Sequence, residues 1–373
     1  MKLQFKKSDL TNAINIVLKA VPSKTPMSIL ECILIDASNG VIHLVGNDNE
    51  FGIETICKGT IEVPGKVALE AKIFSEIIRR LPEAENILLT IETDERNNTV
   101  ITCENSVFKI AGRDGDEFTA LPSIDKNQTV SLSQFSLRQV INQTIFSIAL
   151  NDSNKKMTGE LFEVNGDDFT VTSLDGHRIS IRRVKLNNTY GLSRAIVPGK
   201  ALSELTKILS GGVYDETLIS FSKNHILFEF DDTTVVSRLI DGEYFHVAQM
   251  LSEDYETKIT VNRKKLLECI ERSTIFVKDN DKQPLVFKVE DNVFGLRIHT
   301  ELGTMDAEVP IQKTGNDLMI GFNPRYMVDA LRNIDDEEIN IYMSIPRSPC
   351  FIRDDEKSYN YMILPVNFNP DEV

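Results

Sequence analysis

The chain lacks the sequence features of the common enzyme classes and of membrane proteins. No apolar run in its 373 residues reaches the roughly 18 residues that a membrane-spanning helix needs. It has no Gly-x-x-x-x-Gly-Lys-Ser/Thr phosphate loop, no His-Glu-x-x-His metal motif and no Gly-x-Ser-x-Gly nucleophile motif. None of its five histidines has metal-ligand spacing to a second His or Cys. The sequence therefore predicts neither a metal nor another cofactor.

Cysteine is also scarce. The chain has five cysteines and no Cys-x-x-Cys pair, and the five are widely scattered: Cys32, Cys57, Cys103, Cys269 and Cys350. Such a pattern is typical of buried, reduced thiols in a cytosolic protein. The N-terminal residues from Met1 to Lys7 predict a strand and contain no signal-peptide core. We therefore expect a cytoplasmic location.

Positive charge is in deficit over the whole chain. The sequence holds 41 basic and 56 acidic residues, which gives a net charge of −15. Taken alone, this balance argues against binding to nucleic acid, because attraction to phosphates needs a local positive potential. The distribution of the charge decides the question, and an internal repeat makes that distribution visible.

The chain contains three copies of one pattern. The segment Asp114–Phe118 (Asp-Gly-Asp-Glu-Phe) returns 127 positions later as Asp241–Phe245 (Asp-Gly-Glu-Tyr-Phe). A strand followed by a helix occurs at residues 67–81, 195–209 and 319–334. Its basic residues Lys72, Lys200 and Arg325 lie 128 and 125 positions apart. The repeat predicts three domains, with boundaries at residues 1–124, 125–253 and 254–373.

Each copy combines two helices with a mostly antiparallel sheet. The apolar spacing of Leu10, Ala13, Ile14 and Val17 is that of a half-buried helix. The first helices of the copies are expected at 7–20, 133–149 and 263–278. The strands are expected at 31–36, 41–46, 87–92, 100–103, 160–164, 169–172, 218–222, 226–230, 285–289 and 293–299. Asn39-Gly40 and Gly166-Asp167 predict hairpin turns. The fold class is therefore α+β, with three tandem domains.

Basic residues are concentrated on the six expected helices. The windows 6–19, 72–81, 133–149, 200–209, 263–278 and 325–334 hold 16 basic and 6 acidic residues, a charge of +10. The rest of the chain then carries −25. Helices favour Glu as well as Lys and Arg, so helix propensity alone does not explain the contrast. The helices could face a polyanion while the sheets face solvent.

Five segments carry a resemblance to a known family. The run Leu174–Ile179 (Leu-Asp-Gly-His-Arg-Ile) resembles the Thr-Asp-Gly/Ser-His-Arg-Leu segment of bacterial sliding clamps, the beta subunit of the DNA polymerase III holoenzyme. The other four matching segments, in the same order and spacing as in that family, are 197–200, 237–242, 320–326 and 361–366. The resemblance covers residues 1 to about 368.

The resemblance implies a ring and no catalysis. In this family two chains associate head to tail, so that six domains surround duplex DNA with the helices lining the hole. The clamp fold binds DNA without sequence specificity and tethers the DNA polymerase III catalytic subunit. It also docks the clamp loader and other replication and repair proteins. The expected partners are thus a second copy, double-stranded DNA and these proteins, and the expected location is the bacterial cytoplasm near the nucleoid.

The same resemblance implies three sets of functional residues. A hydrophobic pocket for partner peptides, in which Arg178 and Asn323 supply polar anchors, matches Met157, Leu174, Gly176, His177, Arg178, Ile179, Met250, Asn323, Tyr326, Met362, Ile363, Leu364, Pro365 and Val366. DNA-binding positions match Lys24, Lys72, Arg79, Asn151, Lys200, Lys207 and Arg325. The dimer interface matches Phe108 and Ile110 of the first domain and Ile275 and Phe276 of the third.

Several residues depart from the family pattern. Phe245 stands where a Pro is usual, and Leu174 replaces a common Thr. Gln249 and Met250 fall where an Arg–Val pair is frequent, and the chain runs several residues past the usual end. These differences lie at the rim of the expected pocket and bear on which peptide motif it prefers.

Two other classes of function compete with the clamp. One is a three-domain scaffold that binds acidic or peptide partners and has lost DNA threading. The other is an enzyme built on the triplicated fold. Only Asp175–Arg178 suggests acid–base chemistry, and no nucleophile or second base lies nearby in the sequence. The enzyme is therefore disfavoured.

Overall fold

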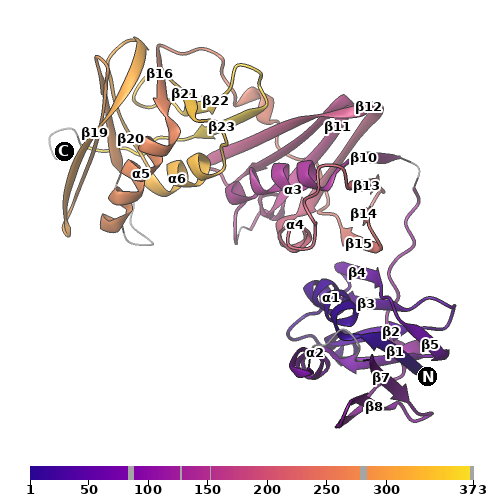
Figure 1. The fold of residues 1–373 in the computed structure, drawn as a ribbon. Helices are drawn as coiled ribbons and strands as arrows, with labels where there is room; N and C mark the ends of the chain where they lie inside the picture. Colours follow the sequence, from indigo (N-terminus) through magenta and orange to yellow (C-terminus); the bar gives the residue numbers. More distant parts are fainter. Residues whose placement is uncertain (83–87, 127, 152, 278–283, 370–373) are drawn as a thin grey trace. The chain divides into compact units, whose positions relative to one another are not determined.

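The computed structural model describes residues 1–82, 88–126, 128–151, 153–277 and 284–369 (Figure 1). It consists of two compact units. The first unit holds Met1–Leu137 and Lys200–Leu239, and the second holds Arg138–Gly199 and Ile240–Val373. Both units contain part of the second sequence repeat.

The first unit contains a five-stranded and an eight-stranded antiparallel sheet. The orders are β5-β1-β7-β8-β9 and β10-β13-β14-β15-β4-β3-β2-β6. The strands are β1 Lys2–Lys6, β2 Cys32–Asp36, β3 His43–Asn47, β4 Phe51–Ile56, β5 Thr60–Val63, β6 Lys66–Glu70, β7 Leu88–Thr93, β8 Asn98–Cys103, β9 Ser106–Ala111, β10 Thr129–Ser133, β13 Glu216–Phe221, β14 His225–Phe230 and β15 Thr233–Arg238.

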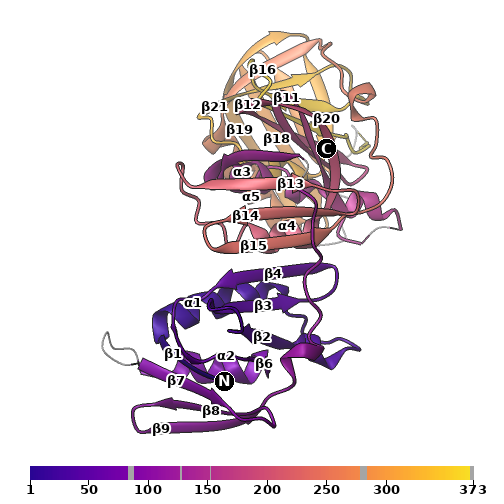
Figure 2. The same ribbon diagram turned by 90° about the vertical axis from the view of Figure 1, so that its right-hand side faces the viewer.

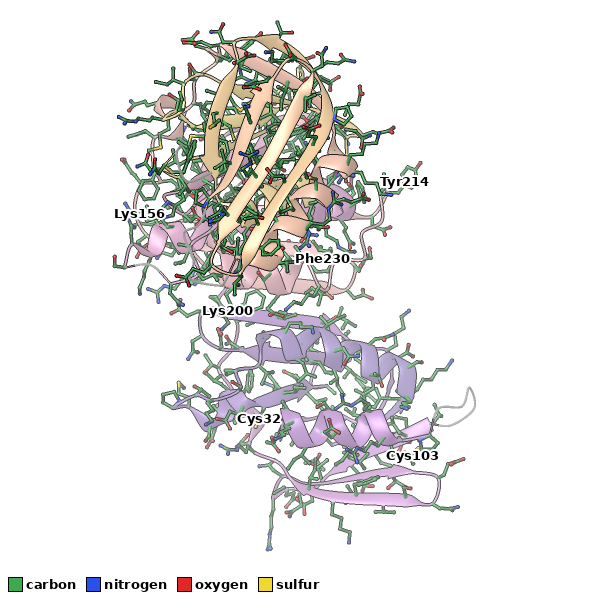
Figure 3. All side chains as sticks on the ribbon, turned by 90° about the vertical axis from the view of Figure 1, so that its left-hand side faces the viewer. Cys32, Cys103, Lys156, Lys200, Tyr214 and Phe230 are labelled. Atoms are coloured by element: carbon green, nitrogen blue, oxygen red, sulfur yellow. The ribbon has the colours of Figure 1, made fainter. Side chains whose placement is uncertain are left out.

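The two helices of the first repeat pack against its strands β1, β2, β3, β4 and β6. In α1 (Lys7–Val17) the buried side chains are Leu10, Ala13, Ile14 and Val17, the four that the apolar spacing predicts. Helix α2 (Ala71–Arg80) packs beside it, burying Phe74 and Ile78. Cys32 and Cys103 lie inside this unit (Figure 3). All five cysteines are buried and free, as the sequence predicts.

The first and second repeats share one sheet. Strand β15 pairs antiparallel with β4, from Thr233 opposite Thr55 to Ser237 opposite Phe51. Figure 2 shows β13, β14, β15 and β4 running side by side. Between β15 and β4 the hydroxyls of Thr233 and Thr55 are 2.9 Å apart and buried. The junction between the two repeats is therefore a continuous hydrogen-bonded ladder.

The second unit is built on one ten-stranded sheet. Its order is β11-β12-β23-β22-β21-β16-β19-β18-β17-β20. The strands are β11 Gly159–Leu174, β12 Arg178–Pro198, β16 Thr257–Asn262, β17 Leu285–Glu290, β18 Val293–Thr300, β19 Gly303–Gly315, β20 Leu318–Phe322, β21 Glu338–Met343, β22 Cys350–Arg353 and β23 Tyr359–Ile363. Strand β12 of the second repeat pairs with β23 of the third, so a shared sheet again joins neighbouring repeats.

Side-chain caps begin the two helices of the third repeat. The Asn262 side chain accepts a hydrogen bond from the Lys265 backbone N–H at 3.0 Å and starts α5 (Arg263–Ser273). The Asn323 side chain accepts one from the Arg325 N–H at 3.0 Å and starts α6 (Pro324–Arg332). Each bond satisfies an amide that the first turn of a helix leaves unpaired. The two helices pack against each other (Figure 1).

Two expectations about local structure are wrong. Residues Gly166-Asp167 do not form a hairpin turn, because β11 continues through them. The extra residues are absorbed by two shifts of register against β12, with Gly166 at φ +65°. The helix expected over residues 133–149 is shorter, because α3 covers Gln134–Asn142 and Thr144 leaves the helical conformation (φ −129°) before a short 3-10 turn at Ile145–Ser147.

The fold class is confirmed as α+β. The described residues contain six α-helices, two from each repeat, with α4 (Gly199–Leu205) completing the second pair. All pairings between the described strands are antiparallel. None of the helices in the described part of the chain is long and apolar enough to cross a membrane.

One buried acid interrupts the apolar strand pattern in the second unit. Glu160 on β11 has no exposed surface, and neither carboxylate oxygen has a hydrogen-bond partner among the described residues. The hydroxyl of Thr144 is nearby, but it donates to the Val140 carbonyl at 2.8 Å. Burial therefore dominates and raises the pKa of Glu160 well above its ordinary value. The folded state therefore keeps this carboxyl protonated to a higher pH than the unfolded chain, which ionises it near pH 4 to 5.

Glu160 should make stability fall as pH rises. A group whose pKa is higher in the folded than in the unfolded state contributes its full stabilisation at pH values below the unfolded-state pKa. This contribution is lost as the pH rises through the folded-state pKa. The neutral Glu160→Gln variant removes the ionisation. The difference in free energy of unfolding, variant minus wild type, should increase from pH 5 to pH 8, by at most about 1.4 kcal/mol per pH unit. Urea unfolding at the two pH values measures this difference.

The matched control is Glu163→Gln on the same strand, where the carboxylate is partly exposed and paired with Arg194. Glu163→Gln removes a partly exposed carboxylate and leaves the buried Glu160 unchanged. A Glu160→Gln advantage that is the same at both pH values would contradict a raised pKa of Glu160 in the folded state.

Candidate functional site

The tight turn between β11 and β12 is organised by one carboxylate. The Asp175 side chain accepts hydrogen bonds from the backbone amides of His177 at 2.9 Å and Arg178 at 3.1 Å. Gly176 sits between them at φ +85°, a conformation that favours glycine. The turn leaves His177 exposed and directs the Arg178 side chain inward, where it is only 8% exposed.

Every nitrogen of the Arg178 guanidinium has a partner. Its Nε donates to Asp175 at 3.0 Å, one terminal nitrogen donates to Asp329 of α6 at 2.6 Å, and the other donates to the Phe146 carbonyl. The guanidinium also lies over the Tyr326 ring at 4.4 Å. Arg178 thus joins the second repeat to helix α6, and its donors are already used within the fold.

Tyr326 connects this ion-pair network to the surface. Its ring stacks on the exposed His177 ring, with centroids 6.1 Å apart and planes at 23°. Burial and the nearby Asp175 carboxylate raise the pKa of the Tyr326 hydroxyl. The His177–Tyr326 pair forms a flat, partly exposed aromatic surface beside the apolar cluster described next.

An apolar cluster brings several predicted pocket residues together. Leu174, Ile179 and Met362 are buried in it, and Met157 and Leu364 pack against it while remaining partly exposed. The cluster also contains residues that the sequence did not single out for the site: Tyr244, Val247, Tyr342 and Phe351, with Leu251 packed against it. Phe245, which the sequence places at the pocket rim, packs against the cluster as well. Alternation along β21 and β22 would have identified Tyr342 and Phe351, because they alternate with side chains of the other core.

The C-terminal segment is pinned along one side of this cluster. The Leu364 N–H donates to the His177 carbonyl at 2.9 Å, and the Val366 N–H donates to the Gly321 carbonyl at 2.8 Å. Pro365 between them has no N–H to donate. Met362 belongs to the apolar cluster, but its neighbour Ile363 is 1% exposed and belongs to the core of the third repeat.

Two further predicted pocket residues have partial roles. The Asn323 side-chain oxygen is engaged in capping α6, as described above. Met250 follows the short 3-10 turn Val247–Gln249, is 49% exposed, and precedes Leu251, which packs against the cluster. Met250 therefore lies at the margin of the apolar cluster.

Most of the predicted DNA-binding residues of the first unit are exposed on helices. Lys72 and Arg79 lie on α2, and Arg79 pairs with Glu76. Lys200 at the start of α4 is 77% exposed and reaches Asp48 at 3.0 Å, and Lys207 just beyond α4 pairs with Glu204 at 2.7 Å. Lys24 is exposed on the loop after α1.

The remaining two DNA-binding predictions fall in the second unit. Asn151 is exposed. Arg325 is only partly exposed, and its guanidinium donates to the Val277 carbonyl at 3.3 Å. A side chain held in this way is less available to a phosphate than the lysines of α2 and α4.

The predicted interface residues lie near strand edges. Phe108 and Ile110 are half-buried on the same face of β9, which is the last strand of its sheet. Ile275 is 75% exposed on the short turn after α5. Phe276 packs against the core of the third repeat, beside Gly303 at the start of β19.

Comparison with known proteins assigns the three repeats. The N-terminal, central and C-terminal domain models of the DNA polymerase III beta subunit match residues 1–122, 131–246 and 248–367. The chain belongs to the DNA polymerase III beta subunit family. The family match covers all three repeats in order, as the sequence resemblance predicts.

Known relatives and solved structures are similar to this chain over nearly its full length. The beta sliding clamp of Staphylococcus epidermidis is 31% identical over 378 residues, covering 98% of this chain and 99% of the relative. A solved structure of a putative DNA polymerase III beta subunit from Eubacterium rectale is 54% identical with a TM-score of 0.95, covering 99% of this chain and 100% of that one. The Bacillus subtilis sliding clamp also superposes with a TM-score of 0.95, at 29% identity and the same coverage.

Replacing Arg178 by Lys should destabilise the fold, because a lysine cannot reach Asp175, Asp329 and the Phe146 carbonyl together. We expect a loss of about 2 kcal/mol or more in the free energy of unfolding, measured by urea titration. Arg194→Lys on the same strand is the matched control, since Arg194 is exposed and, among the described residues, pairs only with Glu163. That change should stay within about 0.5 kcal/mol. Equal losses in the two variants would show that Arg178 does not join the repeats.

Proposed function

We propose that this protein is a non-catalytic sliding clamp of DNA replication. Two chains close head to tail into a ring around duplex DNA, without sequence specificity. The ring tethers the DNA polymerase III catalytic subunit and docks the clamp loader and other proteins at the apolar cluster around Leu174 and Met362. The observation that carries the proposal is the full-length match to the three clamp domains, joined to basic helices on an otherwise acidic chain.

The exposure of the helix charges supports an interaction with DNA. Of the 16 basic residues in the six helix windows, 12 are exposed in the described structure, whereas of the 6 acidic residues only Glu268 is exposed. The outward helix faces are therefore more positive than the residue count alone indicates. A positive surface without a groove-reading motif favours contacts to phosphates, which carry no sequence information.

Two unpaired strand edges support the head-to-tail dimer. Among the described strands, β9 pairs only with β8, and the Gly303–Pro310 half of β19 pairs only with β18. Each edge presents a row of free backbone donors and acceptors, which invites pairing with another strand. The two edges belong to different repeats, so their union is heterologous and makes a ring when it closes.

The side chains at these edges fit that arrangement. Half-buried and exposed residues alternate along both edges. The half-buried residues are Phe108 and Ile110 on β9 and Met305 and Ala307 on β19. Exposed Lys109 on β9 would meet exposed acidic residues, since β19 carries Asp306 and Glu308 at its exposed positions. Ile275 and Phe276 lie beside the β19 edge through the contact of Phe276 with Gly303.

The apolar cluster supports docking of short peptides. Its floor is buried, while Met157, Leu364 and the His177–Tyr326 pair leave partly exposed apolar surface at its rim. Such a surface suits the Leu and Phe anchors of a Gln-x-x-Leu-Phe type motif, which bury a few large side chains. Because its donors are used within the fold, Arg178 is assigned a positioning role.

The dimer is tested by the substitution Ile275→Asp. The side chain is 75% exposed in the single chain, so the change should leave the fold intact. In the proposed interface the carboxylate would be buried without a partner and would shift the chain toward monomers at micromolar concentration. Sedimentation velocity measures the change in oligomeric state.

Leu192→Asp is the matched control, because Leu192 is an exposed leucine on β12, which is neither of the two strands with an unpaired edge. It should remain dimeric like the wild type. An Ile275→Asp protein that stays dimeric at the same concentration would place the interface elsewhere.

A further inference from the structure

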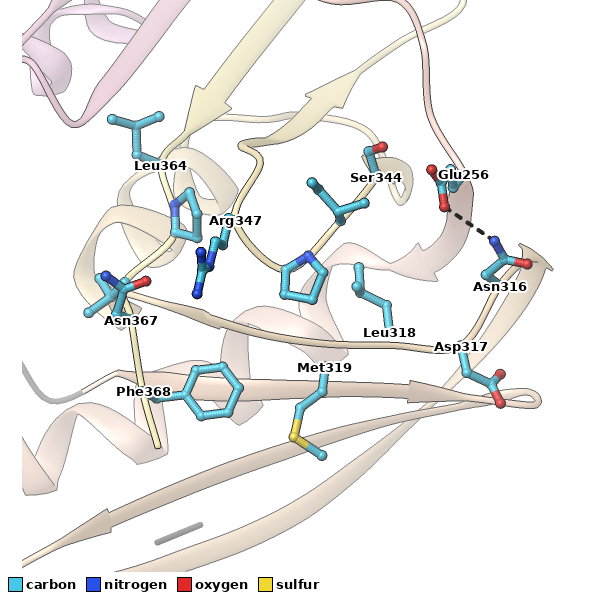
Figure 4. Close-up of a pocket in the computed structure, with 14 residues that line it drawn as sticks. Glu256, Asn316, Asp317, Leu318, Met319, Ser344, Arg347, Leu364, Asn367 and Phe368 are labelled. Atoms are coloured by element: carbon cyan, nitrogen blue, oxygen red, sulfur yellow. Dashed lines mark hydrogen bonds between the residues drawn. The ribbon is translucent and has the colours of Figure 1, made fainter. Parts of the chain in front are cut away.

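The C-terminal segment that borders the apolar cluster also forms a wall of a separate groove. This groove has a volume of about 1050 Å³ and lies entirely within the third repeat. Leu364, Pro365, Val366 and Phe368 line it, and Leu364 also packs against the apolar cluster, so this one residue borders both the peptide site and the groove. The loop Ser344–Arg347 after β21 and the start of β20 complete its walls (Figure 4).

The groove is apolar along its length and charged at its ends. Leu318, Pro346 and the 49% exposed Ile345 supply apolar surface. In Figure 4, Arg347 lies at the end formed by Leu364 and Asn367, whereas Glu256, Asn316 and Asp317 lie at the far end. The two ends therefore carry opposite charge.

Arg347 differs from Arg178 in having no partner. Arg347 is exposed, and no hydrogen bond or ion pair joins it to any described residue. The far-end charges are partly satisfied, because Asp317 pairs with Lys313 and Glu256 accepts a hydrogen bond from Asn316 at 3.3 Å. An unpaired guanidinium on an apolar wall is a ready site for a carboxylate, which it can bind through two parallel hydrogen bonds.

We propose that the groove binds the part of a partner peptide that flanks its apolar anchors, and that Arg347 selects an acidic residue there. The proposal rests on the docking function given above. A peptide whose anchors lie at the apolar cluster reaches Leu364, and its next residues then meet Arg347, because Leu364 borders the cluster and lines the groove together with Arg347. The acidic residue must lie close to the anchors, since Glu256 and Asp317 at the far end repel a second one.

The proposal distinguishes partners that share the same anchors. Peptides with an acidic flank gain an ion pair with Arg347, whereas peptides with a basic flank meet repulsion at the same place. Competition between partners for the apolar cluster is then biased by residues outside the motif itself.

The test is fluorescence anisotropy with a labelled Gln-x-x-Leu-Phe type peptide and extended versions of it. Two Asp residues are added at either end of the motif, and matched peptides carry two Asn residues instead. At low ionic strength, one of the Asp-extended peptides should bind the wild type roughly threefold to fivefold more tightly than its Asn counterpart. Arg347→Ala should abolish this preference and Arg347→Glu should reverse it, while both variants bind the motif-only peptide like the wild type.

Lys223→Glu provides the matched charge reversal, on the exposed turn between β13 and β14 of the first unit. It should leave the Asp preference unchanged. If the motif-only peptide binds but Asp gives no gain over Asn, or if the gain survives Arg347→Glu, the role of the groove is overturned. If the motif-only peptide does not bind the wild type at all, the docking function fails, and the groove proposal fails with it.

Discussion

The antiparallel pairing of β12 with β23 is the contact on which the candidate site depends. It aligns Arg178 opposite Ile363 and Arg182 opposite Tyr359, joining strands that are far apart in the sequence. The His177–Leu364 hydrogen bond extends this ladder to the turn after β11. Without the pairing, the buried residues Leu174 and Ile179 of one repeat would not face Met362 of another.

Polar contacts fix the same junction from the helix side. Arg178 binds Asp329, and the side-chain amides of Gln139 and Gln143 donate to Asp335 at 2.8 and 3.0 Å. The Tyr361 hydroxyl donates to the Gln143 carbonyl at 3.0 Å within the buried core. Within the second unit, these directional bonds tie the Arg138–Gly199 part of the second repeat to the third repeat. A rigid junction suits a docking surface assembled from two repeats, because its shape is formed before a peptide arrives.

The sequence predicted the repeat, the fold class and the start of each first helix, because these depend on local apolar spacing and on turn residues. It failed at Gly166, where a turn-forming pair is absorbed as a bulge within a long strand. Local preference cannot reveal that choice, since it depends on the partner strand β12. The resemblance named Arg178 as a pocket residue, but only the three-dimensional structure shows that Asp175, Asp329 and Phe146 already occupy it. Tyr342 and Phe351 were missed because no strand was expected over residues 338–353, although Phe351 lies directly opposite Met362 in the β22–β23 pair.

Encirclement of DNA is the central claim, and topological retention tests it most directly. The labelled protein is loaded by its clamp loader onto nicked circular DNA and then washed at about 1 M salt, where the Debye length is about 3 Å and phosphate contacts are screened. Gel filtration should show the protein retained on the circle and released once a restriction enzyme linearises the DNA. Loss from the intact circle in the wash, or equal retention on linear and circular DNA, would contradict a ring that slides on its substrate.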